Sequence, residues 1–384
     1  MHPNVIVMAK YFIRVGAEAF WRLLHPRKSS GSEMLCSRSF DLLPPEMIQH
    51  IASFLPASSA AALALCNHGL SGALGEHRWN LLRSDPDERA VFLQCLERDL
   101  PEHLFCDHCA KLHLHCGPAV VIRRRQCSNT DRIDGTTQYY HSRFQFEHVQ
   151  MAMKLHRSGR DTKGYLAQLA PVDTTIRGTH NLYLFEARIV AHEFFVRIQH
   201  WLFIPGNKAF QVPRYAFMVC HHLRTDDFQS PNRPANKLIS MLSCRVAHLN
   251  DKREQTSCER CSGLSRCDYC PTDFRVDFKS FAGRGTAVIV TKWMNLGAGR
   301  VRSDPKWRTH LRNMDDSMVL KEMFCSDLAR QLSALRRFLT ESDGPFEFEA
   351  GSICATFEQK ADFTFDSLVT SKHISMLLAD GRRH

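Results

Sequence analysis

The stretch Leu42-Leu43-Pro44-Pro45-Glu46-Met47-Ile48 opens the segment that decides the fold of the N-terminal part of this chain. Two prolines suit the first turn of a helix, where their missing N–H groups would be unpaired anyway, and an acidic residue there complements the helix dipole. Apolar residues then recur at helical spacing, namely Met47, Ile48, Ile51, Phe54 and Leu55, and Pro56 follows them. The pattern predicts an amphipathic helix that ends before Pro56.

Two more short helices are predicted downstream. Ser58 or Ser59 can cap the second, and Gly69 allows a bend before the third. Their apolar positions are Ala60, Leu63, Leu65, Cys66, Leu70, Leu74 and Trp79. A unit of some forty residues buries only about 60% of its chain surface, so part of this apolar face must meet another surface.

The Leu-Pro-Pro-Glu opening and the apolar spacing that follows it resemble an F-box, the adaptor-binding motif of SCF ubiquitin ligases. The resemblance implies that five residues contact the adaptor that links to the cullin, namely Leu43, Pro44, Ile48, Ile51 and Leu55. The run Ala60-Ala61-Ala62 departs from the motif, because bulkier contacts are usual there. An ordinary helical hairpin packed on its own chain is the alternative interpretation.

The likeness extends to a large family of filamentous-fungal F-box proteins and covers residues 40 to 360. A linking helix is expected over 86–100. The matching stretches after the F-box are 100–113, 185–188, 270–274, 304–308 and 351–358. The resemblance implies a non-catalytic substrate receptor whose protein target is unknown. The domains expected are an N-terminal helix and linker (1–39), the F-box (40–85), a linking helix and Cys/His knuckle (86–116), a strand-rich recognition domain (117–365) and a tail (366–384).

The region after residue 117 is expected to be rich in strands, so the fold class is α+β. Residues 183–204 predict two strands with a turn at 191–193, and residues 274–279 and 286–293 predict a hairpin around Gly283 and Gly285. A final strand pair is expected over 353–365 and a helix over 318–339. No repeat of leucine-rich or propeller period is present.

Cysteine is unusually frequent, with 15 in 384 residues. The strongest chemical signal is a pair of Cys-x-x-Cys motifs, Cys258/Cys261 and Cys267/Cys270, because four thiolates match the tetrahedral ligand set of structural zinc. An alternative joins Cys267 and Cys270 to the distant Cys106 and Cys109, and another is reduced thiols without metal. A structural zinc ion would contribute on the order of 10 kcal/mol to the folding free energy of a small site.

Other cysteines and histidines are weaker candidates. The group Cys106, Cys109, His113, His115 and Cys116 resembles half of a zinc finger without its second half, so a RING-type ligase is not expected. Cys220-His221-His222 and the segment from Cys244 to His248 could supply further ligands, although each alone is more typical of a core or a surface.

Charge and motifs limit the remaining function classes. Fifty basic and 40 acidic residues give a net charge of +10, but the basic residues are interleaved with acids, so nucleic-acid binding is the alternative rather than the main hypothesis. No phosphate loop, dinucleotide fingerprint or catalytic constellation is recognised, and no enzyme activity is expected. An adaptor-bound scaffold outside a ligase is a further alternative.

The first 28 residues place Lys10, Arg14, Glu18 and Arg22 among apolar residues at helical spacing. The pattern favours a helix docked on its own protein, with mitochondrial targeting or a membrane surface as the alternative. No stretch is long and apolar enough to span a bilayer. The ligase role implies the cytoplasm or the nucleus.

Overall fold

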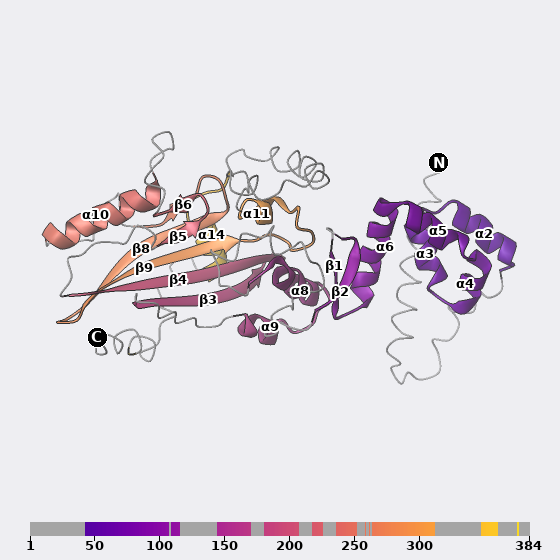
Figure 1. Ribbon diagram of the computed structural model, residues 1–384, viewed down its shortest axis with the longest axis horizontal. Coiled ribbons are helices and arrows are strands. Elements are labelled where there is room, and N and C mark those ends of the chain that lie inside the picture. Colours follow the sequence, from indigo (N-terminus) through magenta and orange to yellow (C-terminus); the bar gives the residue numbers. More distant parts are fainter. Residues whose placement is uncertain are drawn as a thin grey trace, which may run out of the picture. The chain divides into compact units, whose positions relative to one another are not determined.

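The computed structural model describes residues 43–106, 109–115, 144–169, 180–206, 217–225, 236–251, 258, 261, 263–311, 347–359 and 375. These residues form helices and antiparallel strands in the α+β class that the sequence predicts (Figure 1). The chain divides into two compact units between His115 and Cys116. The helices expected within 1–28 and over 318–339, together with most of the C-terminal tail, lie outside the described residues.

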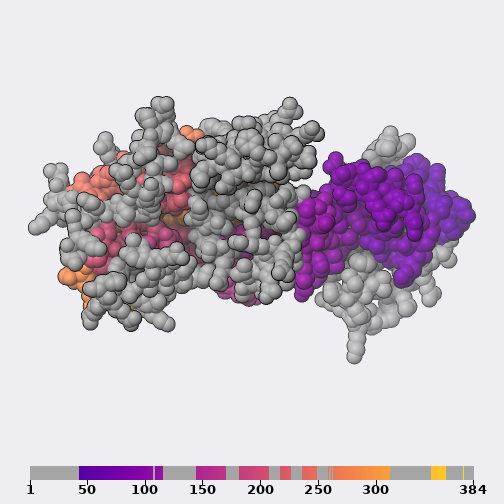
Figure 2. Space-filling model, viewed as in Figure 1, coloured from indigo at the N-terminus to yellow at the C-terminus, as the bar shows by residue number. Residues whose placement is uncertain are grey.

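The first unit is built from short helices followed by one hairpin. The helices are α2 (Pro45–Ser53), α3 (Ala57–Ala64), α4 (His68–Leu74), α5 (His77–Ser84) and α6 (Pro86–Asp99), and the hairpin pairs β1 (His103–Cys106) with β2 (Lys111–Leu114). Pro45 occupies the first turn of α2, and the Asp85 side chain caps α6 by accepting from the backbone N–H groups of Asp87 and Glu88. In the space-filling view these elements, coloured indigo to purple, form one closely packed body (Figure 2).

Alanines let the helices of the first unit pack closely. Ala60, Ala61 and Ala64 on α3 are fully buried, and α3 contacts α4, α5 and α6. The main core cluster joins α2, α3 and α4 through Ile48, Ala52, Ala60, Ala64, Leu70 and Leu74. The N-terminus of α3 is not capped by a serine side chain as the sequence suggested, because Glu88 of α6 accepts from the backbone N–H of Ser58 at 2.8 Å.

The second unit contains a five-stranded antiparallel sheet in the order β3-β4-β9-β8-β7. Its strands are β3 (His180–Val190), β4 (Glu193–Pro205), β7 (Ser265–Arg266), β8 (Thr272–Phe281) and β9 (Gly285–Asn295). The two predicted hairpins are confirmed as β3–β4 and β8–β9. Ala191 and His192, both with positive φ (49° and 62°), form the two-residue turn between β3 and β4, as a type I′ turn requires.

Two further features surround the sheet. The helices are α8 (Phe146–Arg157), α9 (Lys163–Gln168), α10 (Lys237–Asp251), α11 (Pro305–Arg308) and α14 (Ser352–Glu358), and a small hairpin pairs β5 (Met218–Cys220) with β6 (Leu223–Arg224). Phe144, just before α8, packs against Phe185 and Phe194 on one face of the sheet. Within the described residues, no helix meets the length and apolarity needed to span a membrane.

Helix α14 corrects the strand pair expected over 353–365. Residues Ser352–Glu358 are helical, and Ile353 and Phe357 pack with Phe195 and Trp293 on the opposite face of the sheet from Phe194. The buried Asp273 carboxylate of β8 accepts hydrogen bonds from the backbone N–H groups of Gly351, Ile353 and Cys354, at 3.0–3.1 Å. An anion from a distant strand therefore caps this helix, and no local sequence pattern reveals it.

Candidate functional site

The first candidate site is an exposed apolar stripe on α2. Met47, Ile51 and Phe54 are 49%, 38% and 61% exposed, and with Pro44 they follow a spacing of three, four and three residues, which places them on one side of a helix. The other side of α2 carries Ile48 and Ala52 into the core. We call the four exposed residues the α2 stripe.

The structure divides the five residues that the F-box resemblance assigns to the adaptor. Pro44 and Ile51 are exposed members of the α2 stripe. Ile48 is 6% exposed and belongs to the core cluster, against which Leu43 and Leu55 also pack. Met47 and Phe54, which the resemblance did not assign, are the more exposed apolar residues, and their helical spacing in the sequence was the signal that pointed to them.

Three groups of cysteine and histidine are potential metal sites. Two of them are named by the order of their ligands along the chain, not by burial. The outer cluster is Cys220, His222, Cys267 and Cys270, and the inner cluster, whose ligands lie between these in the sequence, is Cys244, His248, Cys258 and Cys261. The first-unit cluster is Cys106, Cys109 and His113. Within each group, the sulfur and nitrogen atoms that could bind an ion all lie within 4.8 Å of one another. Each group could therefore hold a metal ion such as zinc.

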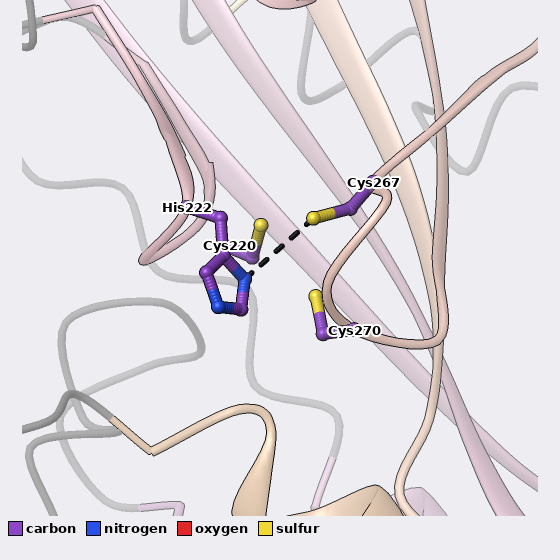
Figure 3. A group of neighbouring side chains, drawn as sticks. All are labelled: Cys220, His222, Cys267 and Cys270. Carbon is purple, nitrogen blue, oxygen red and sulfur yellow. Dashed lines mark hydrogen bonds between the residues drawn. The ribbon is translucent and has the colours of Figure 1, made fainter. Parts of the chain in front are cut away.

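The outer cluster joins the β5–β6 hairpin to the loop between β7 and β8, and Figure 3 shows its three sulfurs and the His222 ring turned toward one another. Cys267 Sγ lies 3.6 Å from His222 Nδ1 and accepts from the backbone N–H of Tyr269 at 3.4 Å. The Cys267 N–H donates to Thr272 O and the Thr272 N–H donates to Cys270 O, so the intervening loop is tightly turned. This turn holds the two cysteines of the loop at a fixed spacing.

Burial dominates the electrostatics of the outer cluster. The three cysteines are fully buried and His222 is half-buried. Hydrogen bonds from the thiols of Cys220 and Cys270 lower the pKa of Cys267, while burial raises the pKa values of Cys220 and Cys270. One of the three sulfurs thus ionises readily, and ionising all three requires a cation among them.

The inner cluster joins helix α10 to the Cys258–Cys261 turn. Cys244 and His248 are four residues apart on α10 and therefore share a face, with Cys244 Sγ 3.6 Å from His248 Nε2 and 3.6 Å from Cys258 Sγ. The Cys261 N–H donates to Cys258 O at 3.2 Å. Cys261 is buried, which raises its pKa to about 12, whereas the other three ligands are half-buried.

These distances can be compared with the edges of a zinc tetrahedron. Bonds of about 2.3 Å to sulfur and 2.0–2.1 Å to nitrogen imply sulfur–sulfur edges of about 3.8 Å and sulfur–nitrogen edges of about 3.6 Å. The outer and inner clusters match, at 3.6 Å for both sulfur–nitrogen pairs and 3.6 Å for Cys244–Cys258. In the first-unit cluster Cys109 Sγ lies only 3.0 Å from His113 Nε2, which is closer than two ligands of one zinc ion. The two clusters of the second unit therefore fit zinc best.

The structure corrects the grouping of Cys258, Cys261, Cys267 and Cys270 into one compact site. Cys258 and Cys261 belong to the inner cluster, and Cys267 and Cys270 to the outer one. Strand β7 lies between the two pairs and is hydrogen-bonded to β8 through Ser265 and Arg266. Because an extended chain advances about 3.3 Å per residue, β7 carries the pairs apart instead of folding them together.

The alternative staple through Cys106 and Cys109 is also absent from the groups that the described residues form. Cys106 and Cys109 lie with His113, while Cys267 and Cys270 lie with Cys220 and His222. The two partner pairs, Cys220/His222 and Cys244/His248, were visible in the sequence as Cys-x-His and Cys-x-x-x-His. Neither spacing alone indicates a metal site. Each pair indicates one only when the fold brings it beside a Cys-x-x-Cys turn.

The sites provide two kinds of chemistry, namely soft ligands for a structural cation and an apolar helix surface for a partner. No protein-family model, curated protein or solved structure matches this chain.

Proposed function

We propose that this protein is an F-box protein, a non-catalytic substrate receptor that docks on the SCF adaptor and presents a target protein for ubiquitylation. The observation that carries the proposal is the α2 stripe, which begins in the Leu-Pro-Pro-Glu segment and continues through the apolar spacing that resembles the motif. A receptor of this kind would act in the cytoplasm or the nucleus.

Energetics favour a partner for the α2 stripe. Fully burying an exposed large apolar side chain contributes about 1.5–3 kcal/mol. Met47, Ile51 and Phe54 are 38–61% exposed on one helix, so covering each of them contributes about half of that. A few adjacent residues of this kind carry most of the binding energy of an interface. Ile48 and Leu55, which pack beneath the stripe, would support it from the core.

The second unit would hold the target in this proposal. A receptor needs no catalytic residue, because keeping a target lysine near a ubiquitin-charged enzyme raises its effective concentration. The same proposal takes zinc as a structural ion of the second unit, since the outer and inner clusters offer only sulfur and nitrogen ligands in sets of four, typical of closed structural sites.

The test of docking is co-purification of the full chain with the SCF adaptor. Ile51→Asp combined with Phe54→Asp should weaken adaptor binding by about a hundredfold or more, because two desolvated apolar contacts become charged. The matched control is Val91→Asp on α6, which also alters an apolar residue that is 48% exposed. It should leave binding unchanged.

Two results would count against the proposal. One is an unmodified chain that does not bind the adaptor, and the other is a stripe variant that binds as well as the unmodified chain. Because all three substituted positions are exposed, the thermal unfolding of the variants should match that of the parent, which separates lost docking from lost folding.

A further inference from the structure

The ligands of the outer and inner clusters follow a nested order along the chain. The outer cluster takes its ligands from 220–222 and 267–270, and every ligand of the inner cluster lies between them, from Cys244 to Cys261. The outer site thus closes a long loop, and the inner site closes a shorter loop within it. Two separate ions are required, because no ligand is shared.

Each cluster has the same composition, three cysteines and one histidine. A zinc ion with three thiolates and a neutral imidazole carries a net charge of −1. Burying that charge is costly unless a cation lies beside it. A zinc site of this composition should therefore come with one buried positive group.

Beside the outer cluster that group is Lys292 of β9, which is 4% exposed. Its Nζ donates to the carbonyl of Met218 at 3.0 Å, two residues before Cys220. Cys220 and Cys270 are the thiols whose charge acts on Lys292. Asp268, in the same loop, pairs with Lys237 at 2.6 Å near the surface, so its charge is already balanced.

Beside the inner cluster the positive group is Arg245, which follows Cys244 on α10 and is 7% exposed. Its Nε donates to the carbonyl of Cys261 at 2.9 Å, and its charge acts on the Cys261 thiol. The guanidinium therefore ties the helix to the Cys258–Cys261 turn at the position where the thiolates gather.

We infer that the second unit binds two zinc ions in nested sites, with Lys292 as the counter-charge of the outer site and Arg245 as that of the inner site. With neutral thiols, either cluster offers no negative charge to its cation. With a bound zinc ion and three thiolates, each cluster carries one negative charge, and the neighbouring Lys292 or Arg245 neutralises it. The inference rests on the zinc binding proposed above and is independent of adaptor docking.

Metal content of the purified full chain tests the nesting. The parent should hold two zinc ions, Cys220→Ser should hold one, and Cys244→Ser should hold one. The control Cys354→Ser, which changes a buried cysteine outside the clusters, should keep two. A parent with no zinc would remove the metal from the proposed function altogether. A parent with a single ion that is lost from both Cys258→Ser and Cys270→Ser would restore one compact site and overturn the nesting.

Affinity tests the counter-charge. In the Cys244→Ser chain, which keeps only the outer site, Lys292→Met should weaken zinc affinity at least about tenfold in competition with a chromogenic chelator. The control Lys279→Met removes the same formal charge at an exposed position of β8 and should change affinity less than twofold.

Lys292→Arg separates charge from packing. It keeps the cation and should retain most of the zinc affinity, whereas Lys292→Met should not. Equal losses for the two variants, or unchanged affinity in Lys292→Met, would overturn the role of Lys292. The same pair of tests applies to Arg245→Met and Arg245→Lys in the Cys220→Ser chain.

Discussion

The two units differ in what they leave outside and what they bury. The first unit packs short helices on alanines and leaves the α2 stripe exposed. In the second unit, strand β4 is buried from Phe194 to Ile204, although it carries Arg197, Gln199 and His200. The first unit thus exposes a group of apolar side chains, whereas the second unit buries charged and polar side chains in its central sheet.

The difference shows where each unit places its specific interactions. Two ion pairs compensate the buried charge of Arg197, one to Glu186 at 2.5 Å and one to Glu358 at 2.7 Å. Trp293 also donates to Glu358 at 3.0 Å. Specific polar contacts therefore hold the second unit together internally. In the first unit the α2 stripe is exposed, as the proposed docking on a partner requires.

The largest expected effect is loss of a ligand of the proposed outer zinc site. Cys270→Ser should destabilise the second unit by about 5 kcal/mol or more, because a structural zinc site contributes on the order of 10 kcal/mol. Thermal unfolding should show a lower melting temperature for the second unit only. Cys258→Ser, at the half-buried inner cluster, should cost less, since that cluster closes the shorter loop. Equal shifts in both units would contradict a zinc site that stabilises the second unit alone.

The next effect concerns the cap of α14. Asp273→Ala should destabilise the second unit by about 4 kcal/mol, because three backbone N–H groups lose their acceptor in a buried place. Asp273→Asn, which keeps one acceptor oxygen, should cost less. Chemical denaturation of the three proteins gives the comparison, and an alanine variant as stable as the parent would show that α14 holds without its cap.

Within the first unit, Ile48 and Ile51 form an internal comparison three residues apart. Ile48→Ala should cost about 3 kcal/mol in the free energy of unfolding, because its side chain fills the core. Ile51→Ala should cost at most about 0.5 kcal/mol, since its side chain is exposed. Adaptor binding should respond in the opposite order once each variant's folded fraction is taken into account. Similar unfolding costs would contradict the assignment of α2's two sides.

The sequence predicted those elements whose causes are local. The prolines and apolar spacing predicted α2, and alternation with turn residues predicted the β3–β4 and β8–β9 hairpins. Helix α14 was mistaken for a strand because its cap is Asp273, about eighty residues away. The cysteine and histidine clusters were half predicted for the same reason. The Cys-x-x-Cys turns are local, but β7 and its pairing with β8 decide which histidine and cysteine join each turn.

The smallest expected effect sharpens the contrast at a buried polar residue of β4. Burial, and then the charge of Lys292, lower the pKa of His200 to about 3, whereas an unfolded histidine titrates near 6.5. Between these values the unfolded chain binds one more proton, so the free energy of unfolding falls as the pH falls, by about 1.4 kcal/mol per pH unit. His200→Gln removes this proton and can still donate to Asn181 as Nε2 does at 3.1 Å. Denaturant unfolding at pH 7, 6 and 5 gives the free energy of unfolding as a function of pH. Below pH 6.5 its slope should be smaller in this variant than in the parent, by the contribution of one proton. Any release of the proposed zinc ions at acid pH would be common to both proteins and would cancel in the difference. Parallel slopes would therefore mean that His200 is protonated in the folded sheet.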